Sequence, residues 1–183
     1  MRSCAICRKR ACKAELWPLK GVAALCDAAP LGGRSPRRGA HICLTAACLT
    51  DYLLRRGGAR QRAEAQARVH QVAQQRLLEL LGLARRCGLL VHGVERVGQQ
   101  SEELFVVVAD DGAKRSQRRL AEAKVFVEAR AMGDATGLPG VVALGIRPSR
   151  LCLQAASWFG VWYDTRTAML ANINSQSAIE VAR

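Results

Sequence analysis

The sequence changes character at Gly57-Gly58, and this change indicates two unlike domains. Before the glycine pair, turn-forming glycines and prolines interrupt short apolar pieces, so residues 1–58 predict a small α+β domain with few short elements. After it, residues 59–76 are rich in Ala, Gln and Arg, and apolar residues recur every three or four positions from Val69 to Ala84. We therefore expect a basic helical linker over 59–76 that continues into the next domain.

The back half of the chain alternates expected helices and strands. Leu104 to Ala109 is a continuous apolar run, which is typical of a strand buried on both faces, and a second run spans Val141 to Ile146. The pattern predicts an α/β three-layer sandwich over residues 77–159. The extension that follows, residues 160–183, shows no clear period, although aromatic residues around its start indicate that this part is packed.

The charge of the chain is strongly basic and unevenly distributed. The formal net charge is +13, and residues 1–58 hold eleven Lys/Arg against three Asp/Glu. Residues 59–76 hold four Lys/Arg against one Asp/Glu, whereas residues 77–183 hold thirteen Lys/Arg against eleven Asp/Glu. Such a basic front half is expected of a protein that binds a polyanion, with an anionic membrane surface or simple solubility as the alternatives. Only eight residues are aromatic, which argues against stacking platforms for single strands.

The compartment is expected to be the cytoplasm. No apolar stretch approaches the roughly 20 residues that cross a bilayer. Two cysteines and a Lys/Arg cluster also stand where the apolar core of a signal peptide would begin. Thiols stay reduced in the cytoplasm, so the eight cysteines are expected to bind metal or to be buried rather than to form disulfides.

Two close pairs of cysteines form a candidate metal site. Cys4 and Cys7 are separated by two residues, and Cys43 and Cys48 by four. Four thiolates are the ligand set of many structural zinc sites, and a small loop-rich domain gains stability from such a staple. His41 lies two residues before Cys43 and is an alternative ligand. The other interpretation is that the cysteines are buried without metal.

Basic residues surround these cysteines and are candidate phosphate contacts. Arginine can hold a phosphate through two parallel hydrogen bonds, and glycine beside it lets the backbone approach closely. The candidates in this segment are Arg2, Arg8, Lys9, Arg10, Lys13, Arg34, Arg37, Arg38, Gly39 and Ala40.

The same residues carry a resemblance to a known family. Residues 2–8, with the sequence RSCAICR, and residues 37–43, with the sequence RRGAHIC, resemble two motifs of the YlxR family (DUF448), Arg-x-Cys-x-x-Cys-Arg and Gly-Arg-Gly-Ala-Tyr-x-Cys. Arg37 stands in place of the first Gly and His41 in place of Tyr, and Trp17-Pro18 replaces an Ile-Arg pair. The resemblance implies an α+β RNA-binding module. Some members lack the cysteines, so the fold does not require zinc.

The back half is similar to the ribosomal L7Ae/L30e-like family over residues 80–88, 92–97 and 107–111. This resemblance implies binding of a bent RNA element, typically a kink-turn, through a Gly-x-Asn-Glu-x-x-Lys segment. Gly93 matches that segment, whereas Glu95, Arg96 and Gln99 stand in place of Asn, Glu and Lys. Gly93, Glu95 and Arg96 are therefore candidate RNA contacts, and the match to the kink-turn motif is partial. The order of the two resemblances is that of bacterial proteins in which both domains are fused.

These observations predict a non-enzymatic, monomeric protein that binds structured RNA, such as ribosomal RNA, ribonuclease P RNA or another folded RNA. Components of the ribosome or of ribonuclease P are the expected partners, and no membrane contact is expected. The adjacent carboxylates Asp110 and Asp111 point to opposite faces of a strand end, so no catalytic residue is expected there. Two alternatives stay open, namely a DNA-binding transcription or nucleoid-associated regulator, and a metal-responsive protein adaptor.

Overall fold

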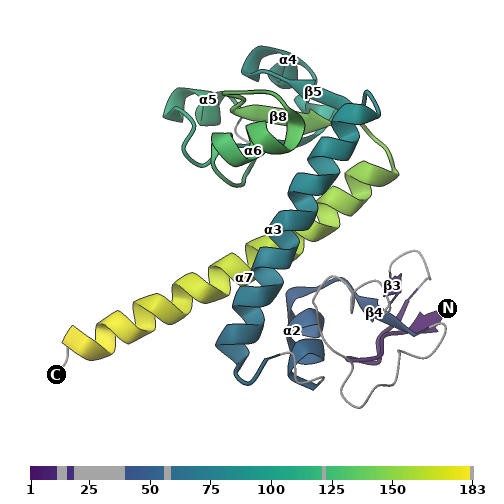
Figure 1. The fold of residues 1–183 in the computed structure, drawn as a ribbon, viewed down its shortest axis with the longest axis vertical. Coiled ribbons are helices and arrows are strands. Elements are labelled where there is room, and N and C mark those ends of the chain that lie inside the picture. The colour runs from purple at the N-terminus through teal and green to yellow at the C-terminus, as the bar shows by residue number, and fades with distance from the viewer. Residues whose placement is uncertain (12–15, 19–39, 56–58, 121–122, 182–183) are drawn as a thin grey trace. The chain divides into compact units, whose positions relative to one another are not determined.

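The computed structural model describes residues 1–11, 16–18, 40–55, 59–120 and 123–181 (Figure 1). The chain contains both helices and small sheets, as expected, and it divides into two compact units. The first unit comprises Met1–Ala73 together with Phe159–Arg183, and the second comprises Gln74–Trp158. We call these the N-terminal unit and the central unit. None of the helices in the described ranges has the length and apolarity needed to span a membrane.

The N-terminal unit begins with two small antiparallel sheets. Strand β1 (Arg2–Ser3) pairs with β2 (Arg10–Ala11), and β3 (Leu16–Pro18) pairs with β4 (His41–Cys43). Helix α2 (Ala46–Arg55) follows β4 directly. The strands in the described part of residues 1–58 are two or three residues long, and short elements are what the frequent turn formers predict there. The buried apolar residues that join these elements are Leu16, Ile42, Leu49, Tyr52 and Leu53.

Helix α3 (Arg62–Arg86) confirms the prediction that one helix runs from the basic linker into the following segment. Just before its start, the N–H of Arg60 donates a hydrogen bond of 2.8 Å to Glu64 Oε2 in the first turn of the helix. Val69, Ala73 and Leu77 are buried along one side, which is the side that the three-to-four-residue period predicts.

Helix α7 (Arg150–Val181) is the structure of the last described part of the chain, for which the sequence predicts no particular element. Residues 160–183 show no clear period in the sequence, yet residues 150–181 form one continuous helix. The period is absent because apolar side chains occur on more than one side. Trp158 and Trp162 are buried, whereas Tyr163 and Leu170 are more than half exposed.

The central unit contains a four-stranded sheet with the order β5-β8-β6-β7. Its strands are β5 (Leu90–His92), β6 (Phe105–Val108), β7 (Lys124–Val125) and β8 (Ala143–Ile146). The β6–β7 pair is parallel, and β8 is antiparallel to both of its neighbours. Every residue of β6 and β8 is buried, so the two apolar runs of the sequence do form buried strands.

Short helices connect these strands: α4 (Val94–Gln99), the 3-10 turn η3 (Ser101–Glu103), α5 (Lys114–Arg119) and α6 (Ala129–Thr136). Val97 of α4 and Leu120, which follows α5, are buried in one cluster with Val91, Val106, Val108 and Ala143 of the sheet. The same apolar cluster therefore fixes both short helices.

Candidate metal centre and basic surfaces

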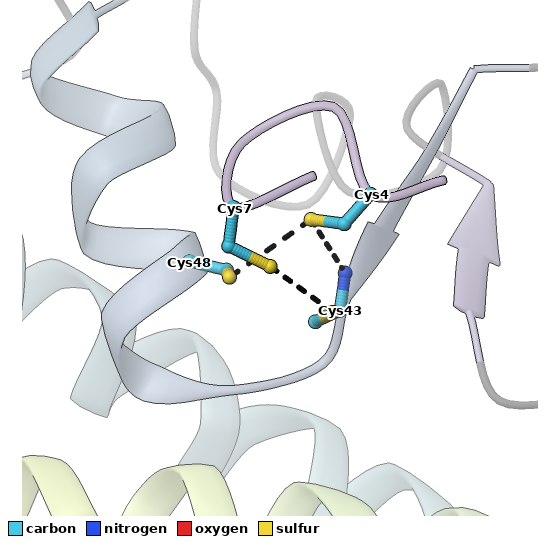
Figure 2. A group of neighbouring side chains, drawn as sticks. All are labelled: Cys4, Cys7, Cys43 and Cys48. Atoms are coloured by element: carbon cyan, nitrogen blue, oxygen red, sulfur yellow. Dashed lines mark hydrogen bonds between the residues drawn. The ribbon is translucent and has the colours of Figure 1, made fainter. Parts of the chain in front are cut away.

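The structure brings the four predicted cysteines together. The sulfur atoms of Cys4, Cys7, Cys43 and Cys48 all lie within 4.8 Å of one another (Figure 2). Cys4 Sγ is 3.9 Å from Cys48 Sγ, and Cys7 Sγ is 3.7 Å from Cys43 Sγ. All four are free cysteines, because these separations are far longer than the roughly 2.05 Å of a disulfide bond.

A tight loop positions the first pair. The N–H of Arg8 donates to the carbonyl of Cys4 at 3.1 Å, and the N–H of Cys4 donates to the carbonyl of Lys9 at 2.9 Å. Arg8 has a φ of 64°, a left-handed conformation that non-glycine residues seldom adopt. The loop therefore turns back on itself directly after Cys7, and strands β1 and β2 close its base.

The second pair is positioned by the junction between β4 and α2. Cys43 ends the strand, and its N–H donates to Cys4 Sγ at 3.3 Å. Thr45 caps the helix, because its hydroxyl oxygen accepts a hydrogen bond of 3.3 Å from the N–H of Cys48. Cys48 thus lies in the first turn of α2 and faces the loop, as Figure 2 shows.

Three of these thiols differ in how readily they ionise. Burial opposes ionisation of Cys4, but the N–H groups of Cys43, Cys7 and Ile6 favour its thiolate and lower its pKa to about 6. Burial raises the pKa of Cys43 to about 12 and that of Cys48 to about 11, and the neighbouring sulfurs add to both shifts. A cation among the sulfurs would remove this conflict, because it favours every thiolate at once.

Two of the sulfur–sulfur separations fit a tetrahedral metal. With metal–sulfur bonds of about 2.3 Å, sulfurs at the corners of a tetrahedron are roughly 3.8 Å apart. The separations of 3.7 and 3.9 Å agree with that value. N–H groups of Ile6 and Cys43 donate to Cys4 Sγ, and such hydrogen bonds stabilise and orient a thiolate ligand of a metal.

His41, the alternative ligand, is a buried strand residue outside this group of four. Its carbonyl accepts a hydrogen bond of 2.8 Å from the N–H of Ala5, and its backbone forms a bridge with Cys4. The residue therefore helps to join β4 to the cysteine loop.

The basic candidates near this centre lie on the surface. Arg2, Arg8, Lys9 and Arg10 are all exposed, and none of them forms an ion pair with another residue of the described ranges. Because they belong to the loop and the two strands that hold Cys4 and Cys7, the cysteine cluster and these cations share one substructure. Ala40 is half-buried just before β4. The other candidates, Lys13, Arg34, Arg37, Arg38 and Gly39, lie outside the described residues.

The candidates of the central unit line a pocket of about 480 Å³. Gly93 begins α4 with a φ of 92°, which glycine adopts without strain. Glu95 and Arg96 follow it and are exposed. Two further arginines, Arg115 and Arg119 of α5, line the same pocket. The sequence reasoning missed them, although a run of four cations in residues 114–119 was the signal that could have identified them.

Asp111 has a structural role. Its Oδ1 accepts a hydrogen bond of 2.8 Å from the N–H of Ala129 in the first turn of α6. Gln117 Nε2 donates to the carbonyls of Ala109 and Asp110, which fixes the segment between β6 and α5. The Asp111 carboxylate and the backbone of Asp110 therefore belong to the hydrogen-bond network of these loops.

Comparisons with known proteins give little further information. No protein-family model and no curated protein matches the chain. Among solved structures, the chain is similar to a protein of unknown function from Bacillus halodurans, with 24% sequence identity and a TM-score of 0.42. That match covers 45% of this chain and 95% of the other.

Proposed function

We propose that the chain binds structured RNA without catalysing a reaction, and that the loop of Cys4 and Cys7 provides its principal phosphate contacts. The observation that supports this most directly is the group of four exposed cations, Arg2, Arg8, Lys9 and Arg10, on a substructure without neutralising ion pairs in the described ranges. Unpaired arginine and lysine side chains gain most from phosphate, because binding releases the counterions of the RNA.

The four cysteines would hold a structural zinc ion. Zinc bound by four thiolates leaves no open position, so it would supply cross-linking and no chemistry. The chain's own contribution is to present four sulfurs from one loop and one strand–helix junction. Holding the loop in place would also fix Arg8 and its neighbours, so that less conformational entropy is lost when RNA binds.

The resemblances to the YlxR and L7Ae/L30e-like families support the same proposal. We also propose that the central unit has the L30e-like three-layer sandwich fold and that the protein is located in the cytoplasm. In the central unit, the pocket beside Gly93 and Arg96 offers a second place for RNA. Few aromatic residues occur in the chain, and folded RNA is recognised mainly through shape, phosphate and 2′-hydroxyl contacts.

Crosslinking in living cells, followed by sequencing of the bound RNA, tests this proposal. The Arg8→Ala/Arg10→Ala variant is the test, and Arg60→Ala/Arg130→Ala removes two exposed arginines elsewhere as a matched control. We expect one or a few structured RNAs to be enriched with the wild type and the control, and lost with the test variant. A profile in which no RNA is enriched, and which is the same for all three proteins, would reject the proposal.

A further inference from the structure

The charge of the central unit is concentrated in one short helix. Residues 74–158 hold twelve Lys/Arg and nine Asp/Glu, a nearly neutral total. Four of those twelve cations, Lys114, Arg115, Arg118 and Arg119, belong to the six residues of α5, which contain no acid. All four are exposed, so the sum over the unit hides a strongly basic surface.

The pocket of about 480 Å³ lies where this helix meets α4. Arg96 of α4 and Arg115 and Arg119 of α5 line it together with His92 and Ser116. The volume is in the range of ordinary ligand pockets, roughly 300–1,000 Å³, and can hold a phosphate with its attached sugar.

These cations are almost unneutralised. The acidic residue that lines the pocket is Glu95, and its carboxylate lies 3.9 Å from Arg119, with both side chains more than half exposed. Such a pair contributes little, and it leaves most of the guanidinium donors open. Arg96 and Arg115 form no ion pair with any residue of the described ranges. Three arginines around one hollow therefore offer a binding site for an anion.

The walls of the pocket are fixed before any ligand binds. Val97 anchors α4 in the core, and Leu120 anchors the end of α5 in the same cluster. A Cβ on Gly98 would lie 3.5 Å from Leu120 Cδ2, which shows how closely the two helices pack. From within α5, Gln117 Nε2 donates to the carbonyls of Ala109 and Asp110 at 3.1 and 3.2 Å. The backbones that carry the arginines are thus held rigidly.

From these observations we propose that Arg115 and Arg119, together with Arg96, form a phosphodiester-binding site of the central unit, separate from the cations of the cysteine loop. This inference rests on the proposed RNA binding and specifies how the second unit takes part. The site would hold one or two consecutive backbone phosphates of the RNA, because forked guanidinium groups match phosphate oxygens.

The test measures binding of a fluorescently labelled transfer RNA, used as a generic folded RNA, to the full chain over a series of salt concentrations. The Arg115→Ala/Arg119→Ala variant removes two pocket cations. The matched control, Arg130→Ala/Arg147→Ala, removes two exposed arginines of the same unit that do not line the pocket. We expect roughly tenfold weaker binding and a salt slope smaller by about 1.5 for the pocket variant, and at most a twofold change for the control.

Two further variants distinguish a failure of this inference from a failure of the proposed function. Arg115→Lys/Arg119→Lys keeps the charge but removes the guanidinium forks, so it should recover most of the salt slope and only part of the affinity. A lysine variant with the reduced salt slope of the alanine variant would overturn the inference. Arg8→Ala/Arg10→Ala tests the loop of the N-terminal unit. If it weakens binding while the pocket variant equals its control, the proposed function stands and this inference is overturned. If the wild type does not bind the RNA, the proposed function itself fails.

Discussion

A Cβ atom at Gly82 of α3 would lie only 2.5 Å from the carbonyl oxygen of Ala135 in α6. The two helices of the central unit therefore meet through backbone, with no space for a side chain at the contact. The neighbouring residues Leu81 and Met132 are fully buried, so neither helix can move away cheaply.

Gly82→Ala should destabilise the chain, because the added methyl group forces α3 and α6 apart. Overpacking of this kind costs about 1–3 kcal/mol, which exceeds the gain of up to ~1 kcal/mol from better helix propensity. Urea unfolding followed by circular dichroism measures the change in midpoint. Gly160→Ala is the control, since a Cβ there meets nothing within 4 Å, and it should raise stability by about 0.5–1 kcal/mol. A neutral or stabilising effect of Gly82→Ala would contradict the close contact.

Removal of one cysteine ligand should abolish metal binding. We expect about one zinc per wild-type chain by native mass spectrometry, and none in Cys4→Ser or Cys48→Ser, because structural zinc needs all four ligands. A loss of about 2 kcal/mol would lower the melting temperature by roughly 4–8 °C. Cys87→Ser changes an exposed free cysteine outside the group and should retain both the metal and the melting temperature. Equal metal content in all variants would exclude the centre.

The stability of the N-terminal unit should fall in mild acid because of His70. Burial lowers the pKa of this imidazole, a hydrogen bond to the backbone of Trp162 opposes the shift, and the charge of Arg166 adds to it. The unfolded chain therefore binds the proton more readily, and stability is lost as the pH falls through the ordinary histidine pKa of about 6.5.

Unfolding of the wild type and of His70→Gln between pH 7.5 and pH 5 measures this effect. Thr165 Oγ1 lies within hydrogen-bond distance of His70 Nδ1, at 3.1 Å, and a glutamine side chain can replace the imidazole as its hydrogen-bond partner. The stability advantage of the wild type should shrink as the pH falls. Parallel pH curves would show that His70 does not titrate with folding.

Local sequence signals predicted much of the fold. The three-to-four-residue period predicted α3, because a helix buried on one face has apolar residues at that spacing. Unbroken apolar runs predicted β6 and β8, because strands buried on both faces are apolar throughout. The sequence of helix α7 shows no such pattern. Its exposed Tyr163 and Leu170 interrupt the polar side that a period requires.

The candidate sites were predicted in part for a similar reason. Cysteine spacing identified all four members of the cluster, but His41 stayed a possible ligand until the structure placed it outside the group. The pocket arginines Arg115 and Arg119 were missed because the charge was summed over the whole back half. The net charge of a segment does not show where its charged residues lie in the fold. The structure shows that Arg115 and Arg119 of α5 line the same pocket as Arg96.

The most direct test of RNA binding compares folded RNA with duplex DNA of equal length at matched salt, with the zinc-loaded wild-type chain and the Arg8→Ala/Arg10→Ala variant. Our account predicts tighter binding of RNA than of DNA. It also predicts a linear fall of log affinity with log salt, and a slope smaller by about 1.5 in the variant. Preference for the DNA duplex would support a DNA-binding regulator instead. A variant with unchanged affinity and slope would show that the cysteine loop does not contact phosphate, and would contradict the account.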